Sequence, residues 1–390
     1  GCRGMKLSGA WIEDPAVQDL CQMLEHGGHR ALLVGGCVRN ALMGEPVSDI
    51  DISTDARPDR VHELAERAGR KAIPTGIDHG TVTVVDAGRG VEVTTFRKDV
   101  ETDGRHAVVV FADDVESDAL RRDFTVNALY TIRNGTVIDP LNGLPDVKAR
   151  RIRFIGDASQ RIKEDYLRIL RFFRFQACYA KPDDGPDADG LAACAALADG
   201  LRSLSRERIG AEMMKLLSAS DPAPVSATMQ KAGILNHVLP GAESALLGPL
   251  VHCEVALGLA ADPVRRLAAL GGEEPEAALR LSRKDAHALA VLKSAPGESA
   301  QALGYRNGET TALDMLCLRA AMNGSEPRMD WPAAAAAGAA AQFPVQADDL
   351  MPNYQGPALG QQLKNLEDRW IASDFTLTRA DLLAENGLTS

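Results

Sequence analysis

The chain has 390 residues, of which 45% are hydrophobic and 25% are charged, and its formal net charge is −11. This length exceeds that of one ordinary domain and predicts roughly two to four domains, with the composition of a soluble globular protein. No apolar run approaches the about 20 residues that cross a bilayer, and the negative charge argues against a protein that coats nucleic acid non-specifically.

The segment from residue 31 to about 140 has the pattern of an α/β fold. An apolar strand at 31–36 ends in a glycine pair, and a helix is predicted at 37–44. Residues 49–54 alternate as a strand with one buried face does, and another helix follows Pro58.

A β-hairpin and a loop are expected next. Strands at 81–86 and 91–96 flank a glycine-containing turn, which is typical of a hairpin. The stretch 97–116 is polar and shows little regular pattern, so we expect a mobile loop there. Ser117 can cap a helix that carries the sequence RRDFTVNALY at 121–130.

After about residue 150 the strand patterns end and helical periodicity takes over. Apolar side chains at helical spacing predict one amphipathic helix at 161–179, and another helix is expected at 205–217. The segment from Lys148 to Arg174 holds nine basic and three acidic residues, which makes a local basic surface. The sequence therefore predicts an α/β head followed by a longer helical body.

Asp49 and Asp51 are the strongest candidates for chemistry. They lie two apart on a predicted strand, so both side chains leave on the same face. Two close carboxylates repel each other, and a divalent cation such as Mg²⁺, which prefers one or two carboxylates plus phosphate oxygens, removes that penalty. Glu92 on the strand 91–96 is a candidate third carboxylate. An isolated pair of this kind is usually a solvent-facing pair of strand acids, and an exposed strand glutamate is the alternative for Glu92.

Gly35, Gly36 and Arg39 supply the context for the acidic pair. A strand that ends in two glycines and opens a helix offers free backbone N–H groups and the positive end of a helix dipole to an anion. The Arg39 guanidinium would add a charged fork for a phosphate. Together with the acidic pair, this arrangement predicts a triphosphate held beside a metal, whereas the glycines alone would be a tight turn.

Two further groups of polar residues are candidates for binding a nucleotide. Arginine suits phosphate and aspartate suits a ribose hydroxyl, and the first group contains both types: Arg121, Arg122, Asp123 and Asn127. The second group lies on the predicted helix at 161–179: Asp165, Arg168, Arg171 and Arg174. An ordinary ion pair is the alternative for the first group, and a solvated helix face for the second.

Asp165 and Arg168 are candidates for reading a base. Spaced i, i+3 on a helix, they can act as one unit. An acceptor beside a donor complements cytosine and adenine, each of which presents an exocyclic amino group beside a ring acceptor. Guanine and uracil carry a carbonyl group there and mismatch.

In their order along the chain, these motifs resemble those of the class II tRNA nucleotidyltransferases, which include the CCA-adding enzymes and bacterial poly(A) polymerases. The resemblance covers about residues 30–215 and rests on LVGGCVRNALMGEPVSDIDIST, RRDFTVNALY, GDASQRIKEDYLRILRFFRF and SRERIGAEM. It implies metal ligation by Asp49 and Asp51, triphosphate contact at Gly36 and Arg39, ribose selection around Arg122 and Asp123, and base selection by Asp165 and Arg168 with Arg171 and Arg174 nearby. It also implies that Glu207, Arg208 and Glu212 stabilise helices.

One position departs from the pattern. The family usually has Val-Arg-Asp where this chain has Val38-Arg39-Asn40. Asparagine keeps the shape and loses the charge, which puts an ionic role for that position in doubt.

The resemblance implies an organisation and an activity. It implies a nucleotidyltransferase head with a mixed or antiparallel sheet and an otherwise helical chain, with these boundaries: head 1–145, neck 146–215, body 216–330, tail 331–390. The enzyme would use two Mg²⁺ ions to add C, C and A from CTP and ATP to the tRNA 3′ end, without a nucleic-acid template and with release of pyrophosphate. No membrane and no obligate protein partner is indicated.

Two alternatives remain open. A poly(A) or A-adding enzyme of the same family is the nearer one, and a catalytically inactive RNA-binding protein is the other. The full-length stretch 97–116 disfavours an enzyme that adds only C, by resemblance to the family. Residues 341–390 hold seven acids and three bases, and this acidic tail favours CCA addition over poly(A) addition.

The cysteines indicate a reducing compartment. The seven are scattered and include no C-x-x-C pair, so neither a zinc site nor a disulfide framework is expected. The first residues lack the features of a signal or transit peptide, which predicts a cytoplasmic protein.

Overall fold

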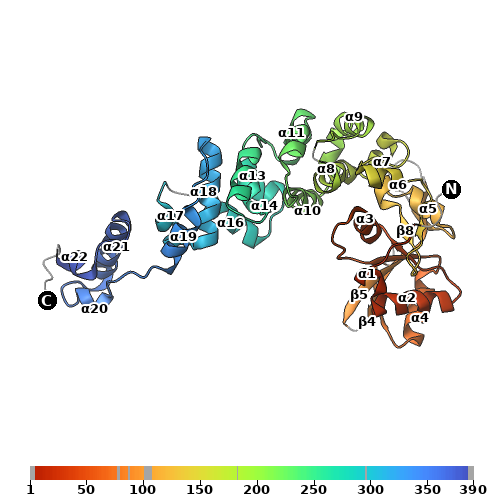
Figure 1. Cartoon of the computed structure of the whole chain (residues 1–390), viewed down its shortest axis with the longest axis horizontal. Coiled ribbons are helices and arrows are strands. Elements are labelled where there is room, and N and C mark those ends of the chain that lie inside the picture. Colours follow the sequence, from red (N-terminus) through yellow and green to blue (C-terminus); the bar gives the residue numbers. More distant parts are fainter. Residues whose placement is uncertain are drawn as a thin grey trace. The chain divides into compact units, whose positions relative to one another are not determined.

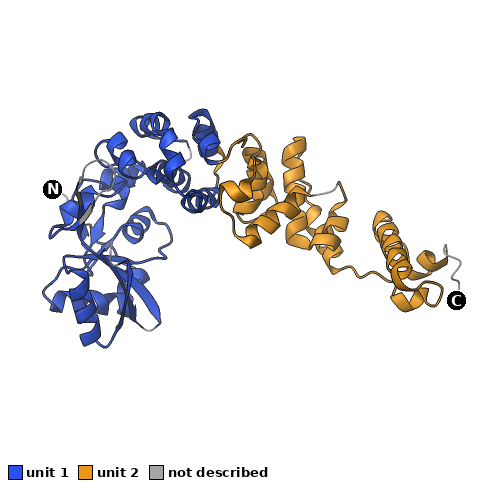
Figure 2. Cartoon of the chain, turned by 180° about the vertical axis from the view of Figure 1, so that it is seen from behind, with its two compact units in different colours: residues 1–220, 224–238 blue, residues 221–223, 239–390 orange. Residues whose placement is uncertain are grey.

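The computed structural model describes residues 5–76, 80–86, 88–100, 108–181, 183–294 and 297–384. The chain divides into two compact units (Figure 2), and their bounds are 1–220 with 224–238 for unit 1, and 221–223 with 239–390 for unit 2. The boundaries expected for head, neck, body and tail stay predictions.

A seven-stranded mixed sheet organises the first part of unit 1, in the order β3-β4-β5-β2-β1-β8-β9. Figure 1 labels three of these strands, β4, β5 and β8. Its strands are β1 (Leu32–Val34), β2 (Asp51–Thr54), β3 (Lys71–Gly76), β4 (Thr81–Asp86), β5 (Arg89–Thr95), β8 (Tyr130–Thr131) and β9 (Val137–Ile138). Strands β2 and β5 run parallel, and the other neighbours are antiparallel. The expected α/β head with a mixed sheet is confirmed.

Four helices belong to this part of the chain, and they are α1 (Ala10–Glu13), α2 (Pro15–His26), α3 (Gly36–Met43) and α4 (Pro58–Arg67). Helix α3 contacts β1. Helix α4 buries Val61, Leu64 and Ala65, and it packs against strands β3, β4 and β5 and against α2. Its remaining side chains are largely polar, so the one apolar stripe fixes which side of the helix faces the sheet.

The irregular loop expected at 97–116 is wrong for much of that stretch. Strands β6 (Arg97–Val100) and β7 (Val108–Phe111) pair antiparallel, from Arg97 opposite Phe111 to Val100 opposite Val108. A separate two-stranded ribbon does not need alternating apolar residues on both of its strands. The polar residues of β6 therefore lack the alternation by which a strand is predicted from sequence. Residues 101–107, which are seven of the 20 residues of the expected loop, lie outside the described residues.

The helix expected at 121–130 is also wrong. Helix α5 (Val115–Leu120) ends before it, and Asp114 caps α5 by accepting a hydrogen bond from the Ser117 N–H at 2.7 Å, so Ser117 is not the cap. Residues 121–130 form only the short 3₁₀ turn η2 (Thr125–Asn127) before β8. Its apolar side chains are buried along the whole segment. The apolar residues therefore do not mark one face of a helix.

The rest of unit 1 is helical, and its elements are α6 (Leu144–Ala149), α7 (Ala158–Glu164), α8 (Leu167–Tyr179), α9 (Ala188–Ala196), η3 (Ala198–Ser203), α10 (Arg206–Leu217), α11 (Ala223–Lys231) and α12 (Ile234–Val238). The single helix expected at 161–179 is broken between α7 and α8. Asp165 has extended φ and ψ angles of −154° and 106°, and its carboxylate accepts a hydrogen bond from the Leu167 N–H at 3.1 Å. Asp165 therefore joins two helices instead of lying within one.

Unit 2 is built from helices α13 (Leu247–Ala256), α14 (Pro263–Leu270), α15 (Pro275–Ala278), α16 (Arg283–Lys293), α17 (Ala300–Asn307), α18 (Glu309–Asn323), α19 (Trp331–Ala340), α20 (Ala347–Leu350), α21 (Gly356–Ala372) and α22 (Arg379–Ala384). The expected helical remainder is confirmed. Across the described ranges, no helix has the length and apolar character needed to span a membrane.

Candidate active site

The glycine pair forms the expected turn between β1 and α3. Gly35 has φ 74° and ψ −121°, a backbone conformation that residues with a side chain rarely adopt. A Cβ atom at Gly35 would lie 3.6 Å from Nη1 of Arg122, an ordinary contact distance, so the guanidinium lies beside the turn. The start of α3 and Arg122 therefore lie next to each other.

The acidic pair lies at the start of β2, with one correction. The strand begins at Asp51 and not at Asp49, and Ile52, Ser53 and Thr54 are all buried instead of alternating. Strand β2 lies inside the sheet between β1 and β5, where both faces are covered, so alternation is not required. Asp49 precedes the strand.

Asp49, Asp51 and Glu92 line one pocket of about 460 Å³, which we call the acidic pocket and which is completed by Ser48, Ile50, Arg89, Gly90 and Val91. Asp51 and Glu92 are direct partners in the parallel register of β2 and β5, so their side chains leave the sheet on the same side. Three carboxylates thus face one space.

The electrostatics of the acidic pocket suit a cation. Partial removal of water raises the pKa of Asp51, and the negative charges of Glu92 and Asp49 raise it further, while Arg122 lowers it. Among the described residues, no group of three or more His, Cys, Asp or Glu side chains is arranged to hold a metal ion by itself. Asp49 and Asp51 are two carboxylates that repel each other, and the pocket beside them has space for phosphate oxygens of a substrate. This is the ligand set that Mg²⁺ prefers.

Six of the residues expected to bind a nucleotide meet in a second pocket. This arginine pocket, of about 290 Å³, is lined by Arg121, Arg122, Asp123, Asp165, Leu167, Arg168, Arg171 and Arg208. Its lining has five arginines and two aspartates, so it favours an anion. Arg122 also lies near β2, because its Nη2 is 3.5 Å from Oγ of Ser53, two residues after Asp51, and its charge acts on Asp51.

Asp118 anchors two of these arginines and was missed in the sequence. Its side chain is fully buried and accepts hydrogen bonds from Arg121 Nη2 at 2.8 Å, from Arg122 Nη2 at 3.0 Å and from the Tyr130 hydroxyl at 2.8 Å. Arg122 and Arg121 hold the pKa of Asp118 below its ordinary value although burial acts in the opposite direction. An acid three and four residues before two arginines looks like a surface salt bridge, and only the tertiary fold buries it.

Replacing Asp118 by alanine is expected to destabilise the protein strongly, because it leaves two partly buried guanidinium groups without their shared carboxylate. We expect the free energy of unfolding to fall by about 3–5 kcal/mol in urea. Asp113→Ala is the matched control, because Asp113 also pairs with an arginine, Arg57, but has an 85% exposed side chain. Its loss should cost less than about 1 kcal/mol. Equal losses in the two variants would show that Asp118 is not an anchor.

Comparisons with known proteins agree with this geometry. A family model described as "Poly A polymerase head domain" matches residues 31–153, and one described as "Probable RNA and SrmB- binding site of polymerase A" matches residues 187–246. A crystal structure of the Bacillus stearothermophilus CCA-adding enzyme in complex with CTP is 28% identical, with a TM-score of 0.76 over 96% of this chain and 98% of that one. The chain is therefore similar to the class II CCA-adding enzymes and poly(A) polymerases, and residues 31–153 match the head domain of that family.

Curated relatives match about half of the chain. The Levilactobacillus brevis CCA-adding enzyme is 42% identical over 203 residues, which are 52% of this chain and 49% of that protein. The mitochondrial CCA tRNA nucleotidyltransferase 1 of Mus musculus is 39% identical over 223 residues, which are 57% of this chain and 51% of that protein. The chain thus spans about half the length of the curated relatives it matches. The match to the polymerase family implies divalent metals.

A chain of hydrogen bonds connects Arg39 to the arginine pocket. Arg39 Nη1 donates to the Asn127 side-chain oxygen at 2.5 Å, the Asn127 amide donates to Asp123 at 2.9 Å, and Arg171 Nε donates to Asp123 at 2.7 Å. The Arg39 guanidinium also lies 4.1 Å from the centre of the Tyr179 ring and is buried. The protein therefore already provides partners for Arg39.

Arg174 and Glu212 extend this network to α10. Arg174 Nε donates to the Glu212 carboxylate, which lies 3.8 Å from Nη1 of Arg171. The Arg174 guanidinium lies 4.5 Å from the centre of the Phe175 ring. These contacts hold α8 against α10 and agree with the structural role expected for Glu212.

Asn40 keeps an acceptor where the family usually has an aspartate. Its side-chain oxygen accepts hydrogen bonds from Arg39 Nε at 3.0 Å and Nη2 at 2.8 Å. Its amide nitrogen donates to the Pro46 carbonyl at 2.8 Å, on the segment that leads to Asp49. Asn40 therefore keeps the side-chain oxygen that accepts from Arg39 but has no negative charge. Its amide N–H donates a hydrogen bond that an aspartate cannot supply.

Asn40→Ala is expected to reduce nucleotide addition about tenfold, because Arg39 loses its two hydrogen bonds to Asn40 but keeps those to Asn127 and Tyr179. A tenfold change corresponds to a net loss of about 1.4 kcal/mol. Asn40→Asp should stay within about threefold of the unmodified chain, since it retains the acceptor toward Arg39. Initial rates with CTP measure both effects. If Asn40→Asp were as impaired as Asn40→Ala, the hydrogen bond to Pro46 would be the essential one and our interpretation would be wrong.

Asp165 and Arg168 both line the arginine pocket, where their side chains have different partners. Asp165 accepts a hydrogen bond from Arg208 Nη2 at 2.8 Å, whereas Arg168 donates to Glu164 at 2.5 Å and to the Arg121 carbonyl at 3.0 Å. The i, i+3 unit expected on one helix is therefore wrong, because the chain breaks at Asp165. The two side chains are instead held separately, each by its own partner, beside the same space.

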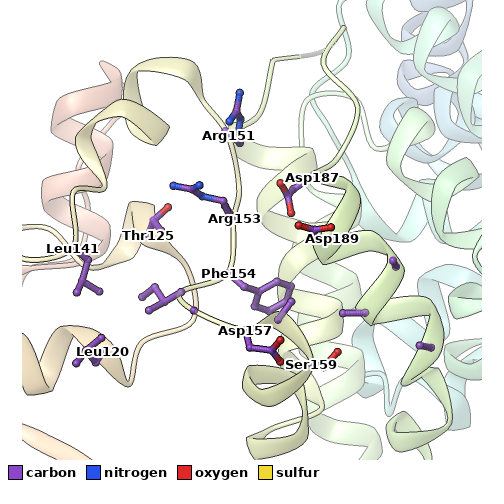
Figure 3. A pocket seen from close by; sticks show the side chains of 16 residues that line it. Leu120, Thr125, Leu141, Arg151, Arg153, Phe154, Asp157, Ser159, Asp187 and Asp189 are labelled. Atoms are coloured by element: carbon purple, nitrogen blue, oxygen red, sulfur yellow. The ribbon is translucent and has the colours of Figure 1, made fainter.

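Another pocket, of about 900 Å³, contains none of the expected site residues (Figure 3). Arg151 and Arg153 lie on its extended wall, while Asp187 and Asp189 lie at the start of α9. Arg153 is paired with Asp146 at 2.9 Å. This pocket is lined by both basic and acidic side chains. It lacks the pair of carboxylates beside a glycine turn that distinguishes the acidic pocket.

Proposed function

We propose that this protein is a CCA-adding tRNA nucleotidyltransferase that extends the tRNA 3′ end with C, C and A from CTP and ATP. The observation that carries the proposal is the position of Arg122. It lines the arginine pocket, its Nη2 lies 3.5 Å from Oγ of Ser53 on β2, and its charge acts on Asp51 of the acidic pocket, which favours one nucleotide that contacts both pockets. The names of the relatives supply the substrates, and a cytoplasmic location stays a prediction from the sequence.

In the proposed reaction, the terminal 3′-hydroxyl of the tRNA attacks the α-phosphate of the nucleotide. A new O–P bond forms to the primer, the bond to the β-phosphate oxygen breaks, and pyrophosphate leaves. Asp49 and Asp51 would hold two Mg²⁺ ions, with Glu92 beside them. Bound there, the ions would lower the pKa of the attacking hydroxyl and neutralise charge on the phosphate oxygens.

The arginine pocket would bind and orient the nucleotide. Arg122 is the best placed to contact the triphosphate, because Asp118 and Tyr130 fix its guanidinium beside the Gly35 turn. Asp123 would lie near the ribose, and Asp165 and Arg168 would contact the base. Orientation by fixed side chains, without a nucleic-acid template, requires that these groups stay in place between additions. Their protein partners provide that rigidity.

The proposal is tested with a tRNA that lacks CCA, incubated with each labelled nucleotide alone and with mixtures. We expect CTP alone to add two C residues, and ATP alone, UTP alone or GTP alone to add nothing. In the mixture of CTP and ATP, we expect one A to follow the two C residues. Product length on a sequencing gel reads this directly. A ladder of A residues from ATP alone would instead indicate poly(A) addition. If no nucleotide were added, the proposed nucleotidyltransferase activity would be wrong.

A further inference from the structure

Two cysteines that are far apart in the sequence meet inside unit 2. Cys253 lies on α13 and Cys317 on α18, 64 positions later, and these helices pack against each other. Both thiols are buried, with exposed fractions of 1% and 0%. Their sulfur atoms are 2.6 Å apart, only about 0.6 Å more than the length of a disulfide bond.

The surroundings of the pair differ from those of the other described cysteines. The Arg265 guanidinium, which bonds Glu254 at 2.9 Å and Asp314 at 2.7 Å, places a buried positive charge near Cys253. Contact with the Cys317 thiol lowers the pKa of Cys253, and Arg265 acts in the same direction, while burial and the negative charges of Glu254 and Glu326 raise it. By contrast, burial raises the pKa of Cys21 to about 12 and that of Cys37 to about 11. Of these thiols, Cys253 is therefore the one favoured to react as a thiolate.

We propose that Cys253 and Cys317 are a site of reversible oxidation and form a disulfide when the protein meets a hydroperoxide. The Cys253 thiolate attacks one peroxide oxygen, which breaks the O–O bond and yields a sulfenic acid and hydroxide. The Cys317 sulfur then displaces the sulfenic hydroxyl, an S–S bond forms, and water leaves. In sum, two thiols lose two electrons and two protons, and hydrogen peroxide is reduced to two molecules of water.

The bond would fasten α13 to α18 and close a long loop of the chain. A cross-link of this kind restricts the unfolded state, more so for a longer loop. We expect the oxidised protein to melt about 5–10 °C higher than the reduced one, with a return to the lower value after reduction by dithiothreitol. None of the residues of the acidic or arginine pockets takes part, so the inference is independent of the proposed function.

The test treats the full chain with hydrogen peroxide, blocks the remaining thiols with N-ethylmaleimide under denaturing conditions, and maps the peptides by mass spectrometry. We expect a cross-linked peptide pair that contains Cys253 and Cys317, with a mass about 2 Da below the sum of its reduced parts, that disappears on reduction. Cys253→Ser should abolish the cross-link and the rise in melting temperature. Cys178→Ser should change neither, because Cys178 is a free, partly buried thiol in unit 1.

The measurement on the unmodified chain decides the matter even if Cys253→Ser fails to fold. Recovery of both cysteines as their maleimide adducts, at peroxide concentrations that oxidise an exposed model thiol, would overturn the proposal. So would a sulfinic acid at Cys253 without a cross-link to Cys317.

Discussion

Asp51→Asn is expected to lower the rate of CMP incorporation by more than about 10³-fold while the chain stays folded. The substitution keeps the size of the side chain and removes the charge that would neutralise a divalent cation beside the transferred phosphate. Loss of such electrostatic stabilisation of a transition state typically costs orders of magnitude in rate. The Asp51 side chain is exposed at the start of β2, so stability should change little. Asp49→Ala should behave in the same way.

The matched control is Asp59→Asn, an exposed acid of the first turn of α4 outside both pockets. Its addition rate should stay within about twofold of the unmodified chain. A second readout that does not depend on catalysis is Mn²⁺ binding in the presence of CTP, which should be lost in Asp51→Asn and kept in Asp59→Asn. An Asp51→Asn variant that retains more than a few per cent of the rate would contradict the assignment of this carboxylate.

The local chemistry of the site could be predicted from the sequence. The glycine turn at Gly35 depends on a conformation that few other residues adopt. The helix that follows is predicted by the helical spacing of its apolar residues. The acidic pair and Glu92 also needed only strand geometry, because the hairpin and the parallel register bring β5 beside β2. Such features are set by residues that are close in the sequence, or by one strand pairing.

Features that depend on tertiary burial could not be predicted. Nothing next to Asp118 in the sequence distinguishes a buried anchor of two arginines from a surface ion pair. The break at Asp165 was hidden because the apolar spacing of α7 continues into α8 across it. The contact between Cys253 and Cys317 likewise arises only when α13 and α18 pack. The sequence therefore identified which side chains carry charge and chemistry, and the fold decided which of them meet.

The break at Asp165 sharpens the prediction for base choice. Because Asp165 and Arg168 are held by different partners, each can face a base edge independently, with Asp165 accepting from an exocyclic amino group and Arg168 donating to a ring acceptor. Asp165→Ala is therefore expected to raise the use of UTP relative to CTP by roughly 5- to 150-fold. That range corresponds to about 1–3 kcal/mol for one lost hydrogen-bond partner. Values of kcat/KM for all four nucleotides measure it.

Arg208→Ala is the control that separates base reading from a structural salt bridge. It removes the 2.8 Å partner of Asp165 but leaves the carboxylate in the arginine pocket. If the pair only stiffens the junction of α7 and α8, both variants should lose a similar, small amount of stability and keep the CTP preference. If Asp165 reads the base, its removal should change the CTP to UTP ratio far more than removal of Arg208. An unchanged ratio in Asp165→Ala would eliminate the role of this residue in selecting the nucleotide.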